Sequence, residues 1–172
     1  MPKIIPELRE KLLFAARKRL LEDETHDFST RQLAADCGVA AGTVYNYFHT
    51  KEALMAAVML EDWQISLNRM EKAAERAESV AAGLSELEAL LRAFSKPYLP
   101  VWCSYNHPAP LPEYHAVLIR QLSHILGVLL QRQEKRCTET ELAVLAELLL
   151  AASLRVEGTV ERLIPVMEKI IA

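Results

Sequence analysis

Apolar residues recur at spacings of three and four along most of the chain, a pattern that predicts helices rather than strands. In the first third of the chain, the pattern predicts a helix from Pro6, a second over residues 29–37, a third over Ala41–Phe48 and a fourth from Lys51 onward. The fourth helix continues with apolar residues well past residue 60. We therefore expect it to connect an N-terminal domain (residues 1–54) to a second domain (residues 55–172).

The rest of the chain is also expected to be helical, with one interruption. Five prolines in residues 97–112 exclude a continuous helix there. Before this segment, the sequence predicts a turn near Gly83 and a helix that starts with a capping box of Ser85 and Glu88. A long helix is expected over residues 113–136, and Thr138 opens another. The fold class is therefore all-α, with a three-helix N-terminal domain and a helical C-terminal domain.

The second and third predicted helices have the features of a helix-turn-helix. Ser29 and Gln32 form a capping box, in which each side chain satisfies a backbone N–H of the other residue. Gly38 follows the second helix, at the position where a left-handed backbone strongly favours glycine. The third helix begins a few residues later. This arrangement suits a helix that enters the major groove of DNA.

One side of the third predicted helix carries residue types that suit DNA contacts. Gly42, Tyr45, Asn46 and His49 share this side, whereas Val44 lies on the opposite, core-facing side. Asparagine pairs bidentately with the edge of adenine, and a glycine permits close approach to DNA. Taken singly, such residues are usually plain surface positions. Their combination with the capping box and the turn glycine favours DNA binding.

The stretch Gly42-Thr-Val-Tyr-Asn-Tyr-Phe-His-Thr-Lys-Glu-Ala-Leu54 resembles the signature of the TetR family of bacterial transcriptional regulators. The resemblance covers roughly residues 8–60 and implies an all-helical, two-domain homodimer that binds a palindromic operator. The chain departs from the family pattern at Cys37, where alanine is common, and at Ala41, where many members have a polar or basic residue. Together, the helix face and the resemblance assign DNA contacts to Thr30, Arg31, Gly42, Thr43, Tyr45, Asn46, Tyr47, His49 and Lys51.

Charge narrows the kind of DNA binding. The net charge is −3, and residues 1–60 contain eight Lys or Arg and eight Asp or Glu. Non-specific affinity for DNA should therefore be modest, because it depends on positive charge that neutralises phosphates. The balance argues against a protein that coats DNA and favours one with locally focused cations. Lys51 is one of these, since a cation at a helix N-terminus is unfavourable unless an anion such as phosphate lies nearby.

The second domain offers candidate contacts for a small, partly apolar effector. Aromatic residues occur within the proline-rich segment, and long structured loops in compact domains are often functional. The alternative is that these side chains only cover or fill the core. The candidates from this segment and the neighbouring helices are Met59, Trp63, Tyr98, Trp102, Tyr105 and Gln121.

The last two predicted helices are expected to form the dimer interface. The first of them is apolar almost all round, so it must be buried on every side. Two such helices at the end of the chain suit a hairpin that pairs with its copy in a four-helix interface. An intramolecular core is the alternative. The predicted interface residues are Leu142, Leu145, Leu149, Ala152, Val156, Val160, Leu163 and Met167.

Other chemistries find little support in the sequence. The three cysteines include no CxxC pair, which suits reduced thiols in a cytoplasm, and no apolar run is long enough to span a membrane. Cys103 and His107 lack a second pair of metal ligands, so we expect neither a metal nor a cofactor. No nucleophile motif or phosphate loop points to an enzyme. The main alternative to an effector-controlled repressor is a ligand-independent dimeric module that binds DNA or protein.

Overall fold

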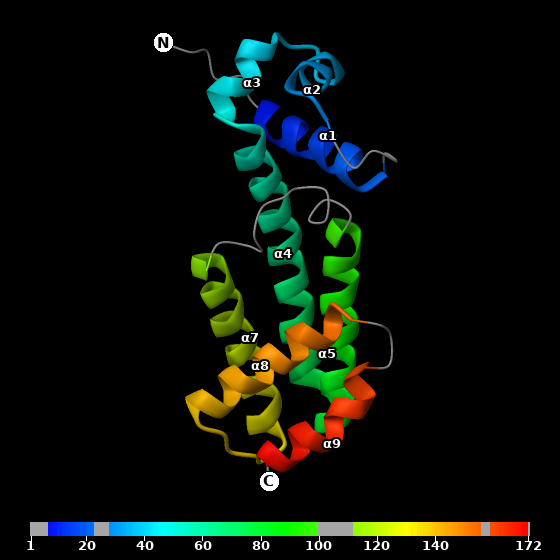
Figure 1. The fold of residues 1–172 in the computed structure, drawn as a ribbon, viewed down its shortest axis with the longest axis vertical. Coiled ribbons are helices and arrows are strands. Elements are labelled where there is room, and N and C mark those ends of the chain that lie inside the picture. Colours follow the sequence, from blue (N-terminus) through cyan, green and yellow to red (C-terminus); the bar gives the residue numbers. More distant parts are fainter. Residues whose placement is uncertain (1–6, 23–27, 100–111, 156–158, 172) are drawn as a thin grey trace. The chain divides into compact units, whose positions relative to one another are not determined.

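The computed structural model describes the chain except for residues 1–6, 23–27, 100–111, 156–158 and 172. Secondary structure in the described part consists of helices (Figure 1). The elements are α1 (Leu8–Glu22), α2 (Thr30–Asp36), α3 (Ala41–Tyr47), α4 (Lys51–Arg76), α5 (Val80–Ser95), the 3₁₀ turn η1 (Lys96–Tyr98), α7 (Pro112–Arg132), α8 (Glu139–Ser153) and α9 (Thr159–Ile171). The predicted fold class, with an N-terminal helix-turn-helix and a C-terminal helical domain, is confirmed. In the described ranges, no helix is long and apolar enough to cross a membrane.

The chain forms two compact units. The first unit contains the described residues of Met1–Gln64 and Pro97–Tyr105, and the second contains those of Ile65–Lys96 and Asn106–Ala172. Helix α4 therefore contributes to both units. The chain passes from the first unit to the second within α4, and it returns to the first unit at Pro97. The predicted boundary after residue 54 stays a prediction.

The core of the first unit is built from the apolar faces of α1 to α4. Val44 of α3 and Leu33 of α2 are almost fully buried, as is the long apolar stripe of α1. This cluster comprises Leu8, Leu12, Leu13, Ala16, Leu20, Phe28, Leu33, Ala34, Val44, Phe48, Leu54, Met55 and Val58. Burial of these side chains supplies most of the stability of α2 and α3, because helices of seven residues are only marginally stable by themselves.

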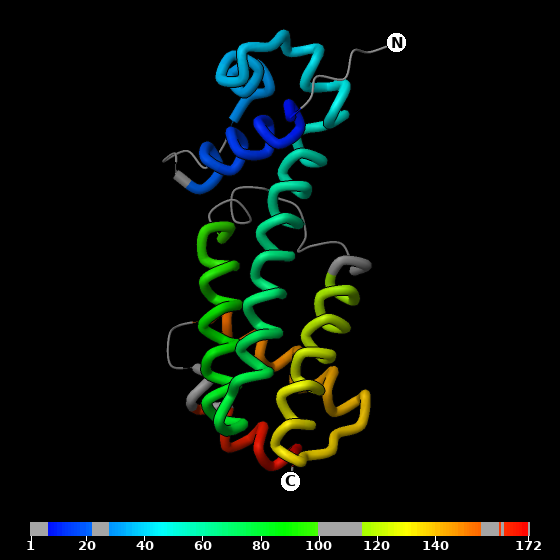
Figure 2. The backbone as a smooth tube through the Cα atoms, turned by 180° about the vertical axis from the view of Figure 1, so that it is seen from behind, coloured from blue at the N-terminus to red at the C-terminus, as the bar shows by residue number. Residues whose placement is uncertain are grey.

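The second unit is a helical bundle in which α8 packs against both α5 and α7, and α9 packs against α5 and α8 (Figure 2). The capping box predicted at Thr138 and Glu141 is present and begins α8. The predicted box at Ser85 and Glu88 is wrong. Helix α5 is capped six residues earlier, by Ser79, whose side chain accepts a hydrogen bond from the backbone N–H of Ala82.

The turn predicted near Gly83 is also wrong, because Gly83 lies inside α5. A Cβ at this position would clash with both methyl carbons (Cδ1 and Cδ2) of Leu129, which is fully buried on α7. The glycine therefore allows α5 and α7 to approach closely. A glycine can mark either a turn or a close contact between helices. Residue spacing in the sequence does not distinguish these two roles.

A polar cluster completes the first unit. Tyr98 of η1 is only 1% exposed and donates a hydrogen bond to Asp62 of α4 (2.5 Å). Arg17 of α1 donates to the other oxygen of Asp62 (Nε to Oδ1, 2.8 Å) and to Glu61 (3.1 Å). The Nη1 atom of Arg9 lies 3.7 Å from Oε1 of Glu61. The cluster joins α1, α4 and the residues that follow α5.

Burial, followed by the hydrogen bond to Asp62, raises the pKa of Tyr98 far above its ordinary value. Below about pH 10, this tyrosine is protonated in both the folded and unfolded states, so the contribution of its environment to stability is fully present. Above about pH 10, the unfolded chain releases this proton while the folded chain keeps it. The free energy of unfolding should then fall by up to about 1.4 kcal/mol per pH unit from this residue.

Tyr98→Phe is expected to remove this one-proton contribution, so its stability should decline less steeply in alkali. Urea unfolding at about pH 8 and about pH 11 measures the difference. Tyr45→Phe, at an exposed position, is the control and should keep the steep decline. Burial also raises the pKa of Cys37 and Cys137, and their contribution is common to all three proteins. Equal slopes for both variants would contradict the assignment.

Candidate nucleic-acid interface

The turn between α2 and α3 has the local geometry that the sequence predicts. The Ser29 side chain accepts from the Gln32 backbone N–H (3.2 Å), and the Gln32 side chain accepts from the Ser29 backbone N–H (2.9 Å). Gly38 has a φ of +67°, in the left-handed region that favours glycine. The backbone N–H groups of Gly38 and Val39 donate to the last carbonyls of α2. This turn fixes the direction in which α3 leaves α2.

The outward side of α3 carries the residues predicted to read DNA. Gly42, Tyr45, Asn46 and His49 are exposed, whereas Val44 on the other side is buried. Phe48, directly after α3, is also buried. A Cβ built on Gly42 would meet no atom of the chain within 4 Å. The space beside Gly42 on this side of α3 is therefore open.

The flanking residues lie at the rim of this face. Thr43 and Tyr47 of α3 are half-buried, as is Thr30 at the start of α2, while Arg31 is exposed. Lys51 begins α4, and its Nζ lies over the Phe28 ring, 5.2 Å from the ring centre. Such a cation–π contact restrains the long lysine side chain at this helix start.

Arg9 was not among the predicted contacts. Its guanidinium carbon lies 5.6 Å from the centre of the ring of Phe48, which directly follows α3. The sequence gives no sign of this contact, because Arg9 and Phe48 are far apart along the chain and meet only through packing of the first unit. Arg9 therefore adds a positive charge beside the end of α3.

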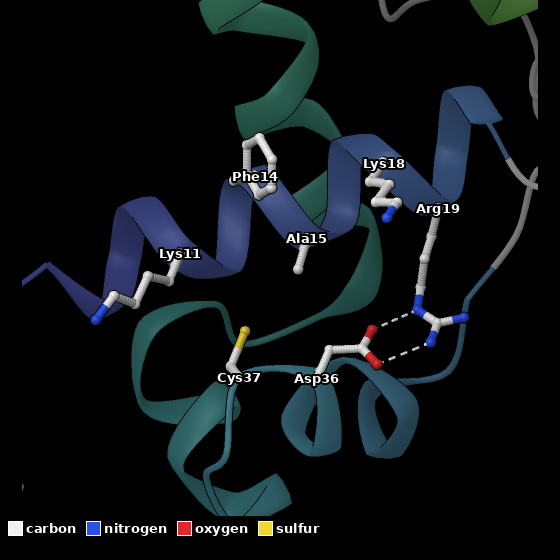
Figure 3. Close-up of a pocket in the computed structure, with 7 residues that line it drawn as sticks. All are labelled: Lys11, Phe14, Ala15, Lys18, Arg19, Asp36 and Cys37. Carbon is white, nitrogen blue, oxygen red and sulfur yellow. Dashed lines mark hydrogen bonds and ion pairs between the residues drawn. The ribbon is translucent and has the colours of Figure 1, made fainter.

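A cavity of about 590 Å³ lies between α1 and α2 (Figure 3). None of the predicted effector contacts is among the residues that line it. At one end, Arg19 and Asp36 face one another and form two hydrogen bonds (2.6 and 2.9 Å). These bonds hold the pKa of Asp36 below its usual range. Cys37 faces the cavity from the end of α2, and burial raises the pKa of its thiol, which makes it a poor nucleophile. The other lining residues are Lys11, Phe14, Ala15 and Lys18.

The predicted effector contacts are spread over both units. Met59 and Trp63 belong to the first unit, with Trp63 buried, and Gln121 is half-buried in the second. Tyr98 differs from the expectation, because it is buried and bonded to Asp62 instead of lining an open cavity. Trp102 and Tyr105 lie outside the described residues. The described ranges contain no group of three or more His, Cys, Asp or Glu side chains that could hold a metal ion.

The predicted dimer residues on α8 and α9 mostly face the chain's own core. Leu145, Leu149, Ala152 and Met167 are at most 1% exposed, so in this conformation they have no surface for a partner. Leu142 is half-buried, and the side chains of Val156, Val160 and Leu163 lie outside the described set. The exposed side of α8 instead carries Val144 and Ala151, with Leu148 half-buried between them. Helix α8 is apolar on both of its sides, and the spacing of apolar residues alone does not predict which side packs against the rest of the chain.

Comparison with known proteins agrees with this geometry. The family model for bacterial regulatory proteins of the tetR family matches residues 12–58. The HTH-type transcriptional regulator UidR of Escherichia coli (strain K12) is 34% identical over 67 residues, which are 39% of this chain. The match spans about a third (34%) of the length of UidR.

Solved structures resemble the whole chain. A transcriptional regulator from Cytophaga hutchinsonii has a TM-score of 0.67 at 18% identity, covering 96% of this chain and 95% of that one. The multidrug binding protein EbrR, complexed with imidazole, has a TM-score of 0.68 at 19% identity, covering 98% and 92%. The fatty acid degradation regulator FadR from Bacillus halodurans has a TM-score of 0.57 at 16% identity, covering 98% and 96%. These likenesses concern the fold of the whole chain. The sequence match to the tetR family of bacterial regulatory proteins concerns the helix-turn-helix region, residues 12–58.

Proposed function

We propose that the protein is a transcriptional regulator of TetR type that binds a palindromic operator as a homodimer, acts as a repressor and leaves DNA when a small, partly apolar effector binds. The observation that carries the DNA-binding part is the exposed side of α3. It holds Gly42, Tyr45 and Asn46 outward on a helix whose other side is fixed in the core by Val44. A helix held in this way is suited to the major groove.

The proposed contacts divide by chemistry. Asn46 reads a base edge, and Tyr45 adds a flat apolar surface and a hydroxyl. Phosphates are bound by residues at the rim, where contacts fix the position on DNA without reading its sequence. The rim residues are Thr30, Arg31, Thr43, Tyr47 and Lys51. His49 lies on the outward side with Tyr45 and Asn46.

The proposed homodimer is formed by α8 and α9. The exposed side of α8, which carries Val144, Leu148 and Ala151 beside Glu147, supports this assignment better than the buried side does, and Leu154 directly after the helix adds to its apolar surface. Exposed apolar surface on a helix is unfavourable in water, and a second copy of the chain would bury it. Two copies also place two α3 helices on the two halves of a palindrome.

Control by an effector follows from a population shift. An effector that binds one conformation of the second unit better than another shifts the populations by its difference in affinity. Helix α4 carries Lys51 at its start and runs into the second unit, so its position links the two functions. Two structural relatives, a multidrug binding protein and a fatty acid degradation regulator, are compatible with an apolar effector. The alternative remains a dimeric module that binds DNA without an effector.

Selection from a random double-stranded DNA pool, followed by fluorescence anisotropy, tests the proposal. The selected sequence should be palindromic and bind roughly 10³-fold or more tightly than its scrambled version. The affinity should fall as salt rises, because phosphate contacts release counterions. Light scattering of the complex should show an even number of chains per DNA. Equal affinity for selected and scrambled DNA at every salt concentration would reject a specific regulator.

A further inference from the structure

The first unit is completed by a residue that lies far away in the sequence. Residues Ile65–Lys96 belong to the second unit, yet Pro97 and Tyr98 belong again to the first. Tyr98 is 1% exposed, which is as complete a burial as that of the leucines in the core of α1. Its side chain is thus an integral part of the unit that carries the reading helix.

The Tyr98 hydroxyl is bound at the point where α1 meets α4. Asp62 accepts from Tyr98 on one carboxylate oxygen (2.5 Å) and from Arg17 on the other (2.8 Å). Arg17 also donates to Glu61, the neighbour of Asp62 on α4. One carboxylate therefore holds donors from α1 and from the segment after α5. Loss of either donor leaves Asp62 with a weaker set of partners in a partly buried place.

The contacts of α1 and α4 connect this point to the DNA-binding face. Helix α1 is bonded to the end of α2 by Arg19 and Asp36, and its Arg9 lies over Phe48, directly after α3. Helix α4 begins with Lys51, three residues after Phe48. A change in how α1 sits on α4 therefore moves the supports of α3 on two sides.

We propose that Tyr98 is a positioning residue for DNA binding: through Asp62 and Arg17, it fixes α1 on α4 and thereby the orientation of α3. This inference rests on the proposed function. The chain passes from the second unit back to the first between Lys96 and Pro97, and Tyr98 follows the last residue of α5 by only three positions. A shift of the segment after α5 would therefore reach α3 by way of Tyr98 and its hydrogen bond to Asp62.

Tyr98→Phe in the full-length protein tests the proposal, because it keeps the buried ring and removes only the hydroxyl. Ser153→Ala is the matched control. Ser153 is 2% exposed in the second unit and donates to the Leu150 carbonyl (2.8 Å), so its hydroxyl is also buried and bonded. The measurements are operator affinity by anisotropy on the selected palindrome, thermal stability, and amide hydrogen exchange of α1.

Tyr98→Phe should weaken operator binding about fivefold, the factor that corresponds to one net hydrogen bond, and should raise exchange in α1. Ser153→Ala should change affinity less than about twofold even if it lowers thermal stability equally. Arg17→Met should also weaken operator binding. The double variant Tyr98→Phe/Arg17→Met should lose less affinity than the product of the two single fold-losses, because both residues act on Asp62.

Three results would overturn the inference. The first is an operator affinity for Tyr98→Phe equal to that of Ser153→Ala. The second is a double variant whose loss is the full product of the single losses. The third is an unaltered protein that selects no DNA sequence, which rejects the proposed function and with it any positioning role, whatever happens to exchange in α1. The first two results leave the proposed function in place, so the two failures are distinguishable.

Discussion

Replacing both Tyr45 and Asn46 with alanine is expected to abolish most of the preference for operator over scrambled DNA and to leave the fold intact. Both side chains are exposed on α3 and take no part in the core, so the free energy of unfolding should change by about 0.5 kcal/mol or less. A bidentate contact to a base contributes about 1–3 kcal/mol of discrimination, so Asn46→Ala alone should cost roughly 5- to 150-fold in specificity.

The measurement is the ratio of affinities for selected and scrambled DNA, taken by anisotropy at one salt concentration. Two matched controls remove the same kinds of side chain elsewhere. Phe14→Ala removes an aromatic ring that is 68% exposed on α1, and Asn68→Ala removes an exposed amide on α4. Both should keep the ratio of the unaltered protein. A double variant of α3 that discriminates as well as these controls would show that another surface reads DNA.

Arg92→Met is expected to destabilise the second unit strongly. Arg92 of α5 donates to Glu88, which is only 7% exposed, and to the backbone carbonyls of Ala152 and Arg155 at the end of α8. Removal of the guanidinium leaves a buried carboxylate and two helix-terminal carbonyls without this donor. The free energy of unfolding should fall by about 3 kcal/mol, the usual cost of leaving one partner of a buried pair alone.

Urea unfolding of two further variants separates burial from charge. Arg76→Met breaks the Arg76–Glu86 pair, whose side chains are 68% and 37% exposed, and should cost no more than about 1 kcal/mol. Adding Glu88→Leu to Arg92→Met should restore part of the loss, because the lone buried carboxylate is then gone. If Arg92→Met were no more harmful than Arg76→Met, the buried pair would not be a significant support of the second unit.

Features that depend on neighbouring residues were predictable from the sequence. The capping boxes at Ser29 and Thr138 and the left-handed Gly38 were predicted correctly, because each is decided by a few adjacent residues. The buried and exposed sides of α3 also followed from the sequence, since only one side of that helix is apolar. The fold class and the likeness of residues 12–58 to the tetR family followed from the same local signals.

Features that depend on packing were not predictable. Gly83 gave the signal of a turn, but the structure uses it for the contact of α5 with Leu129. Helix α8 is apolar on both sides, and the side predicted to face a second copy is the one its own chain buries, at Leu145 and Leu149. Tyr98 was interpreted with its neighbours in a proline-rich segment, whereas its partner Asp62 is 36 residues away.

The sequence by itself determined that this protein is helical, that it carries a helix-turn-helix of TetR type and which side of α3 faces outward. These properties arise from interactions over one or two helical turns, and such interactions are written in residue spacing. Only the tertiary structure decided which face of α8 is left exposed, where Arg9 lies, and that Tyr98 belongs to the first unit. These features depend on which segments, distant in the sequence, pack against the same surface. The pattern of residues along one helix does not specify that packing.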